Sequence, residues 1–241
     1  MLTNQAMTRG RSGLLYAASL SVALGAPMAG ADVIFGSPAD RTILDLSTDI
    51  LADGVSAEVG VNGGIMRTYV VPFQLPARPA GTVVTAADIE FRVLRNMQSS
   101  PMNVDLYALT PRTSSTVLAT DQYAGPLDPG ATLIQNDFIT VAGTDINSYV
   151  VVHTDAGGDA ALADYLNDAY ASHGAGAWVF FRLSCDAASV PNINFYFVDS
   201  SDWLQYTTTR SPRLNVTFGV PTPGVAGVLG LGALAAVRRR R

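Results

Sequence analysis

Short apolar runs with a period of two recur along most of this chain. Ile89, Phe91 and Val93 alternate with Glu90 and Arg92. Such alternation is typical of strands that bury one face and expose the other. Further runs of this kind span residues 66–73, 104–108, 138–141, 149–152, 178–183, 193–198 and 214–218.

The segments between these runs are rich in turn-forming residues. Residues 76–81, 125–130 and 155–159 contain the Gly, Pro and Asp that tight turns require. Many short strands separated by such turns predict an all-β fold, a single β-sandwich of the jelly-roll type. We expect this body to span residues 32–219, which is long enough to bury its own core.

One segment has the period of a helix instead. Its apolar stripe consists of Leu162, Tyr165, Leu166, Ala169 and Tyr170. We expect Asp159 to cap the start of this short helix and Gly174 to end it.

The oxygen-rich stretch from Asp155 to Asp159, which includes Gly157 and Gly158, has two interpretations. It could bind Ca²⁺ through carboxylates and carbonyls, or it could form a turn and a helix N-cap. Its spacing differs from that of an EF-hand, so we favour the turn.

Residues 1–31 have the three parts of a signal peptide. Arg9 and Arg11 precede an apolar stretch over residues 14–26, which is short for a membrane span of about twenty residues. The stretch ends in an Ala-x-Ala site formed by Ala29 and Ala31. We therefore expect signal peptidase to cut before Asp32.

Residues 220–241 form a second segment with the features of a targeting signal. Val220, Pro221, Thr222, Pro223 and Gly224 break the chain before an apolar run over residues 225–237. The run predicts a short hydrophobic helix, and it is followed by Arg238, Arg239, Arg240 and Arg241. By the positive-inside rule these arginines stay in the cytoplasm and the body lies outside.

The order of a Pro-x-Pro motif, an apolar helix and an arginine cluster resembles the PEP-CTERM sorting signal of exosortase substrates. Thr222 stands where that family usually has Glu. The resemblance implies transient insertion into the bacterial inner membrane, cleavage near the Pro motif by an exosortase-type enzyme, and delivery to the cell surface or matrix. A plain membrane anchor that is never cut is the alternative.

The body has a second resemblance, to DNRLRE-type domains related to carbohydrate-binding modules. It is carried by residues 68–75, the turn Pro79 to Thr82, residues 86–93 and the closing strand with Pro212, Arg213 and Leu214. This resemblance implies a jelly roll and, by analogy, sugar binding.

The charge distribution argues against a nucleic-acid partner. All twenty carboxylates lie in the body, together with only nine of the fifteen arginines. The resulting net charge of −11 repels phosphate backbones.

We expect no catalytic site, metal or cofactor. The sequence lacks a Gly-x-Ser-x-Gly motif, and His153 and His173 have no ligand spacing with each other or with Cys185. We expect Glu58 and Glu90 to be solvated surface groups, and Cys185 to be buried as a small apolar side chain rather than to act as a reactive thiol.

Trp203 and Tyr206 lie in a polar segment before the last strand. An exposed pair of aromatic rings can stack on sugars, whereas rings in loops can also fold back onto the core. The sequence thus predicts an exported structural or adhesive protein of the extracellular matrix. The alternative is a carbohydrate-binding module with Trp203 and Tyr206 at its site.

Overall fold

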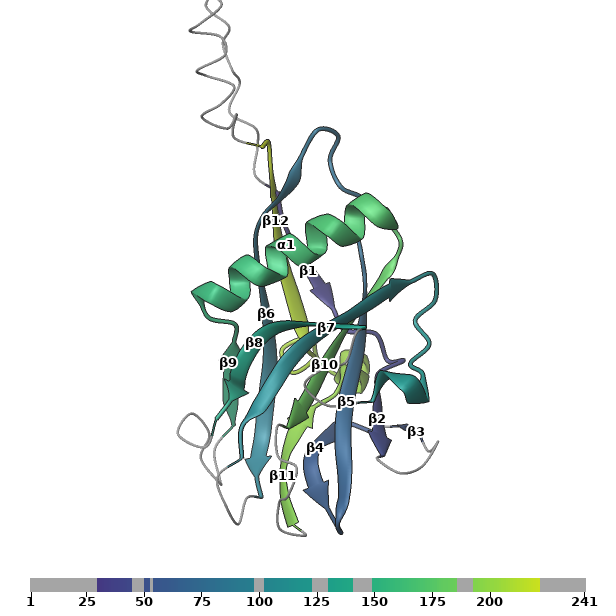
Figure 1. Cartoon of the computed structure of the whole chain (residues 1–241), viewed down its shortest axis with the longest axis vertical. Helices are drawn as coiled ribbons and strands as arrows, with labels where there is room; N and C mark the ends of the chain where they lie inside the picture. Colours follow the sequence, from purple (N-terminus) through teal and green to yellow (C-terminus); the bar gives the residue numbers. More distant parts are fainter. Residues whose placement is uncertain are drawn as a thin grey trace, which may run out of the picture.

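The computed structural model describes residues 30–44, 50–52, 54–97, 102–122, 130–140, 149–185 and 193–221. Within these residues the chain forms twelve strands in one antiparallel sheet and one α-helix, α1 (Ala156–Ser172). The sheet curls into a half-barrel, and α1 lies across it (Figure 1). The prediction of a mostly-β body with one helix is confirmed.

The strands are β1 (Gly30–Phe35), β2 (Arg41–Leu44), β3 (Ile50–Ala52), β4 (Ser56–Asn62), β5 (Ile65–Gln74), β6 (Val83–Asn96), β7 (Val104–Arg112), β8 (Ala131–Ile139), β9 (Val150–His153), β10 (Trp178–Cys185), β11 (Ile193–Asp199) and β12 (Arg213–Gly219). Their order is β1-β12-β6-β11-β4-β5-β10-β7-β8, with β2 and β3 beside β5 and β9 beside β6. Two 3-10 turns are η1 (Ala119–Asp121) and η2 (Ser201–Gln205).

Every run predicted from the alternation overlaps a strand, whereas β1 to β4 were not predicted. Strand β1 lies at an edge of the sheet and is mostly exposed, so it has no apolar period. In β4, Gly60 has φ +122 and its hydrogen faces the backbone of Phe195, so a side chain would not fit there.

The main hydrophobic core lies inside the curl. The rings of Tyr69 on β5 and Phe91 on β6 meet edge to face at 6.3 Å, although these strands are not hydrogen-bonded neighbours. Phe91 also contacts Phe138 on β8, with the ring centroids 5.8 Å apart. One curled sheet therefore encloses this core between its own strands, whereas the sequence predicts a sandwich.

The helix α1 packs its predicted stripe on this core. Leu162, Leu166, Ala169 and Tyr170 are buried. The N-cap is Asp155, whose carboxylate accepts hydrogen bonds from the backbone of Gly157 and Gly158, so the helix starts earlier than the predicted cap at Asp159. After the helix, Gly174 has φ +79, the left-handed conformation that glycine adopts most easily.

Strands β5 and β10 are buried on both faces. Phe181 packs in the main core, whereas Phe180 and Val70 pack in a second cluster with Ile43, Leu109 and Val117. The outer face of β10 also buries Arg182, whose guanidinium donates to the backbone carbonyls of Asp121 and Gln122. A strand enclosed on both sides can carry an almost continuous apolar sequence.

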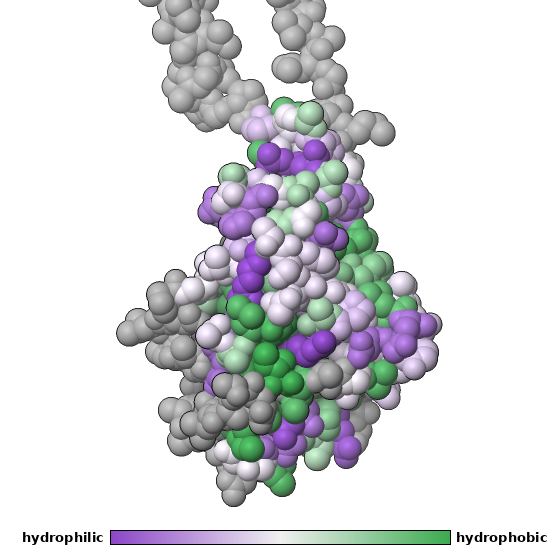
Figure 2. All heavy atoms as spheres, turned by 90° about the vertical axis from the view of Figure 1, so that its right-hand side faces the viewer, coloured by the Kyte–Doolittle hydropathy of each residue, from purple (hydrophilic) through white to green (hydrophobic). Residues whose placement is uncertain are grey.

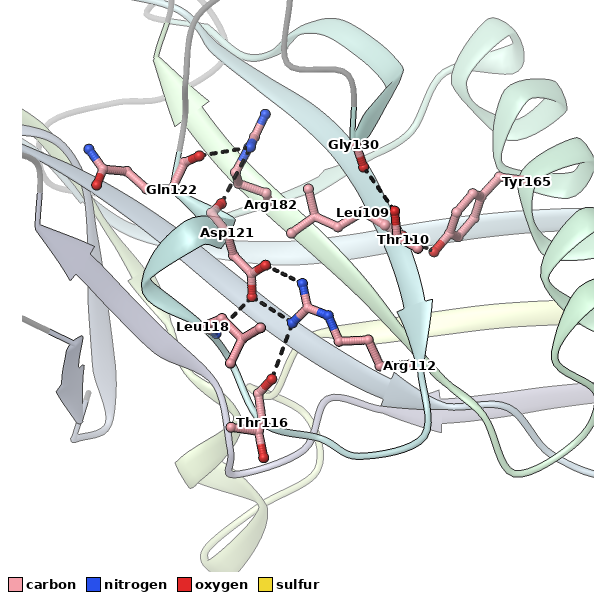
Figure 3. Close-up of polar contacts among 10 residues, drawn as sticks. All are labelled: Leu109, Thr110, Arg112, Thr116, Leu118, Asp121, Gln122, Gly130, Tyr165 and Arg182. Carbon is pink, nitrogen blue, oxygen red and sulfur yellow. Dashed lines mark hydrogen bonds and ion pairs between the residues drawn. The ribbon is translucent and has the colours of Figure 1, made fainter. Parts of the chain in front are cut away.

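An ion pair holds the segment around η1 over this second cluster (Figure 3). The guanidinium of Arg112 pairs with both oxygens of Asp121, and it also lies 4.4 Å above the ring of Phe180. The Asp121 carboxylate accepts the backbone N–H of Leu118 as well. These contacts satisfy a buried carboxylate, and we interpret the cluster as structural.

Both ends of the described chain leave the body at the same end. Strand β1 pairs with β12 so that Gly30 lies opposite Phe218 and Phe35 lies opposite Arg213. All strands and both apolar clusters lie between Gly30 and Val220. We therefore expect residues 30–221 to fold on their own.

Replacement of Leu166 by alanine tests how much α1 contributes to this core. Leu166 is fully buried, so Leu166→Ala should lower the free energy of unfolding by about 2–5 kcal/mol. The exposed neighbour Asp164 provides the control, because Asp164→Ala should change stability by less than about 0.5 kcal/mol. Urea denaturation of residues 30–221 measures both, and equal effects would contradict the packing of α1.

Candidate functional site

The segment 200–212 leaves the sheet between two strands that follow one another along β6. Strand β11 pairs with the end of β6, with Val198 opposite Val93, and β12 pairs with its first part, with Arg213 opposite Glu90. The connecting segment contains η2 with Trp203, and Tyr206 directly after it. The predicted ligand-binding pair therefore lies outside the ladder, beside β6.

Asp199 fixes the base of this segment. Its buried carboxylate accepts two hydrogen bonds from Arg210, at 2.9 and 2.7 Å. Arg92 on β6 adds a third cationic contact, with its Nε 3.7 Å from the same carboxylate. Burial raises the pKa of Asp199, and the hydrogen bonds and charge of Arg210 oppose that rise. This clamp ties the segment to β6.

Asp40 forms a second anchor for the segment. Its carboxylate accepts the backbone N–H of Ser201 at 2.7 Å and the hydroxyl of Tyr69. Burial, with a smaller contribution from the nearby charge of Asp202, raises the pKa of Asp40 from 3.8 to about 6, and the two hydrogen bonds oppose this shift. The segment is thus held at its start by a carboxyl group that titrates above its usual range.

The predicted aromatic pair is present but is only partly available to a ligand. Trp203 is half-buried, and its ring meets that of Tyr206 edge to face at 5.6 Å. The guanidinium of Arg210 lies 3.5 Å above the Trp203 ring and covers one of its faces. Tyr206 is 67 % exposed. Trp203 is therefore intermediate between the two predicted alternatives. It is partly folded back onto the body, and it still lies beside the exposed ring of Tyr206.

An open pocket of about 280 Å³ lies beside the pair. Its lining residues are Ser56, Leu94, Arg95, Tyr149, Phe197 and Arg210. Arg210 connects the pocket to the pair, because its guanidinium also lies 5.8 Å from the ring of Tyr149. The volume is just below the usual range for drug-sized ligands, so the pocket suits one small residue of a longer chain.

A β-bulge in β6 places Arg95 at this pocket. Phe197 pairs with Arg95 and Val198 pairs with Val93, so Leu94 is the extra residue. Beyond a bulge the alternation of side chains shifts by one position. As a result Arg95 is exposed and borders the pocket, whereas the next residue, Asn96, is buried.

We call the group around the pocket the aromatic–arginine site. It consists of Arg92, Arg95, Tyr149, Trp203, Tyr206 and Arg210. Sequence reasoning found only Trp203 and Tyr206 of these. The others come from three segments that are far apart in the chain, and only the pairing of β6 with β11 and β9 brings them together.

The Asp155 segment takes the form of the favoured turn and cap. Asp155 caps α1, and Asp159 accepts a hydrogen bond from the hydroxyl of Thr154 at 2.5 Å. Within the described ranges, no group of three or more His, Cys, Asp or Glu side chains is arranged to hold a metal ion. Cys185 is buried, as expected, with its sulfur 3.0 Å from that of Met66.

The expectation that both glutamates are solvated is wrong for Glu90. Glu90 is only 9 % exposed, and its carboxylate pairs with the guanidinium of Arg213 on the neighbouring strand. Glu58 is half-buried and pairs with Arg67 at 2.9 Å. Cross-strand partners allow these carboxylates to lie against the sheet.

The predicted processing sites lie at the margins of the described chain. Ala31 and Asp32 lie in β1, and Ala29 lies outside the described residues. Val220 and Pro221 follow the end of β12. Residues 222–241, which include Thr222, Pro223, Gly224 and the four terminal arginines, lie outside the described part.

Figure 2 shows the side of the body that carries β2 and β3. Apolar residues gather in the lower part of this face beside strongly hydrophilic ones. Leu51 on β3 and Leu118, next to η1, are 38 % and 44 % exposed. Single exposed apolar side chains are common on folded proteins and do not define a site by themselves.

No family model matches the chain, and no curated protein matches it either. None of the helices in the described ranges has both the length and the apolar composition of a membrane span. The site is therefore interpreted from its own geometry.

Asp40 should make stability depend on pH. Its carboxyl titrates near 3.8 when unfolded and near 6 when folded, so the stability it contributes is full below about pH 4 and is lost as the pH rises through about 6. Asp40→Asn should remove about 1–3 kcal/mol of the decline between pH 4.5 and 7. Urea denaturation at several pH values measures this.

Asp164→Asn, on the exposed face of α1, is the matched control and should leave the decline unchanged. Identical pH profiles for the wild type and Asp40→Asn would contradict the assignment.

Proposed function

We propose that this chain is an exported bacterial protein whose β body serves as a non-enzymatic structural or adhesive component of the extracellular matrix. The observation that carries the proposal is the aromatic–arginine site, an exposed group of rings and guanidinium groups beside an open pocket. Rings of this kind present flat apolar area to a sugar at a low cost in conformational entropy. The contact we propose is with extracellular polysaccharide.

The chemistry of the site suits binding better than bond cleavage. Asp199 is fully buried, and Arg210 occupies both of its oxygens. A general acid or base must reach the proton that it transfers, which a carboxylate held in this way does not.

The expected export signals are compatible with the way the body ends. Cleavage before Asp32 would remove only Gly30 and Ala31 from β1, and Asp32 to Phe35 would keep their pairing with β12. Strand β12 ends at Gly219, just before the Pro-x-Pro motif. Both processing enzymes would therefore act close to the edge of the sheet without cutting into its core.

We also propose that the tail is a PEP-CTERM-like signal. It would hold the protein transiently in the inner membrane until an exosortase-type enzyme passes it to the surface. The site lies beyond Arg213, the end of β12 that is farther from the tail, at a distance of roughly 20 Å along the strand. A body tethered through Gly219 would thus hold the site away from the membrane.

We further propose that the body is a jelly roll related to DNRLRE-type domains. The chain contains β5, a turn and β6 in the order that the DNRLRE-type resemblance implies, and β12 follows Pro212 directly. In that turn Thr82 donates its backbone N–H to the carbonyl of Pro79, and Gly81 has φ +76. The contact between Tyr69 and Phe91 supports a jelly-roll-like arrangement of two facing layers.

A dedicated carbohydrate-binding module is the second candidate. It is favoured by the pocket, which gives one sugar residue a defined place beside Tyr149. The two candidates differ in their affinity for glycans. A carbohydrate-binding module binds one particular glycan strongly, whereas a structural protein does not depend on such binding.

Intact-mass analysis of the protein from each cell fraction of its native host tests the export proposal. We expect a species that starts at Asp32, ends near Pro221 and lies outside the inner membrane. A species that keeps Arg238 to Arg241 and stays in the inner membrane would show that the tail is a plain anchor. The matrix role would then have to be abandoned.

A glycan array probed with residues 30–221 separates the two candidates. If the protein is a binding module, Tyr149→Ala should weaken binding about tenfold, because it removes a ring that is 63 % exposed at the pocket. Tyr206→Ala shows which ring of the site binds, since Tyr206 is equally exposed but does not line the pocket. A larger loss in Tyr206→Ala than in Tyr149→Ala would place the sugar at the pair of Trp203 and Tyr206 instead of the pocket. Absence of binding to every glycan would overturn both the binding module and the proposed contact with polysaccharide, and would leave only a structural role without sugar contact.

A further inference from the structure

We propose that the pocket of the aromatic–arginine site binds the carboxylate of an acidic sugar residue, with Arg95 as the group that pairs with it. The partner is a polysaccharide that contains uronic acids. This inference rests on the proposed contact with polysaccharide and names the chemical class of that ligand.

Arg95 differs from every other arginine of the body. Within the described part of the chain, Arg95 has no ion pair, side-chain hydrogen bond or aromatic ring contact. The other eight are Arg41, Arg67, Arg78, Arg92, Arg112, Arg182, Arg210 and Arg213, each of which has at least one such partner. An unpaired guanidinium in a chain with an excess of carboxylates leaves its donors available to a ligand.

The charge around the pocket is opposite to that of the body. The body carries nine arginines against twenty carboxylates, yet the described residues that line the pocket include two arginines and no carboxylate. Asp199, the acid of the clamp, does not appear among these lining residues, and its oxygens contact Arg210 and Arg92. An anionic ligand therefore meets a local positive charge that Asp199 does not cancel.

The geometry of guanidinium favours a carboxylate. The planar fork of an arginine side chain can donate two parallel hydrogen bonds to the two oxygens of a carboxylate. In this pocket Arg210 already uses that fork on Asp199, whereas Arg95 does not. The bulge at Leu94 gives Arg95 its exposed position at the pocket, which normal alternation would deny it.

Tyr149 supplies the second half of the recognition. Its ring is 63 % exposed, and the guanidinium of Arg92 lies 4.6 Å from the ring centroid. Cation–π contacts with Arg92 and Arg210 hold the ring at the edge of the pocket. A sugar ring can lie against Tyr149 while its carboxylate reaches Arg95, because both residues line the same pocket.

The test measures binding of residues 30–221 to immobilised polygalacturonate and to its methyl ester, which has the same backbone without the charges. Biolayer interferometry at low and high salt gives the affinities. We expect the wild type to bind the polyuronate at least tenfold more tightly than the ester, and this preference to shrink with added salt.

Arg95→Gln should abolish the preference for the polyuronate. Arg78→Gln is the matched control, because Arg78 is also exposed, the change in net charge is the same, and Arg78 lies on Tyr170 rather than at the pocket. We expect this control to stay within twofold of the wild type. Equal losses in the two variants would reduce the effect to net charge and would overturn the proposal.

Other outcomes separate this inference from the proposed function. Equal binding of polygalacturonate and its ester would overturn the acidic-sugar assignment and leave the contact with polysaccharide. Equally tight, Arg95-dependent binding of dextran sulfate would overturn the choice of carboxylate as the ligand group. Absence of binding to every polymer would overturn the inference, while the export proposal would still depend on the mass analysis.

Discussion

The pairing of β6 organises this protein. Strand β6 is the longest strand described, and it forms ladders with β12, β11 and β9. Since β11 and β12 follow one another along it, the chain between them cannot stay in the ladder and must leave the sheet. That excursion carries Trp203 and Tyr206, and the bulge at Leu94 turns Arg95 toward the same place. The architecture of the sheet and the location of the site therefore have one origin.

Two carboxylates are buried to anchor the site, and burial of a charged carboxylate is electrostatically unfavourable. Asp40 and Asp199 are both fully buried where they anchor segment 200–212, and burial raises the pKa of each. A buried carboxylate is tolerated only when hydrogen bonds or opposite charges replace its water. Arg210 does this for Asp199, and Tyr69 and Ser201 do it for Asp40. Two buried carboxylates of a strongly acidic body thus hold the segment, while Arg95 remains exposed at the pocket.

Most strands and α1 can be predicted from the sequence, because the spacing of apolar residues along the chain shows which side chains share a buried face. It does not predict β1, whose exposed edge position leaves no apolar pattern. The site is predicted in part, since Trp203 and Tyr206 stand out as rings in a polar segment. Arg95 was not found because normal alternation would turn it inward, and a bulge is a property of the paired strands. Tyr149 and Arg210 were not found because only long-range pairing brings them together.

The pairing of β1 with β12 also constrains when the body can fold. In the described sheet the first strand hydrogen-bonds to the last strand, and Gly30 finds its partner at Phe218. Contacts so far apart in sequence close late, because a long loop must be ordered first. A chain threaded through a membrane from its N-terminus would therefore stay open until nearly all of it had crossed. If the chain is exported as proposed, the pairing of β1 with β12 would form only on the far side of the membrane, and the chain would stay competent for transport during its passage.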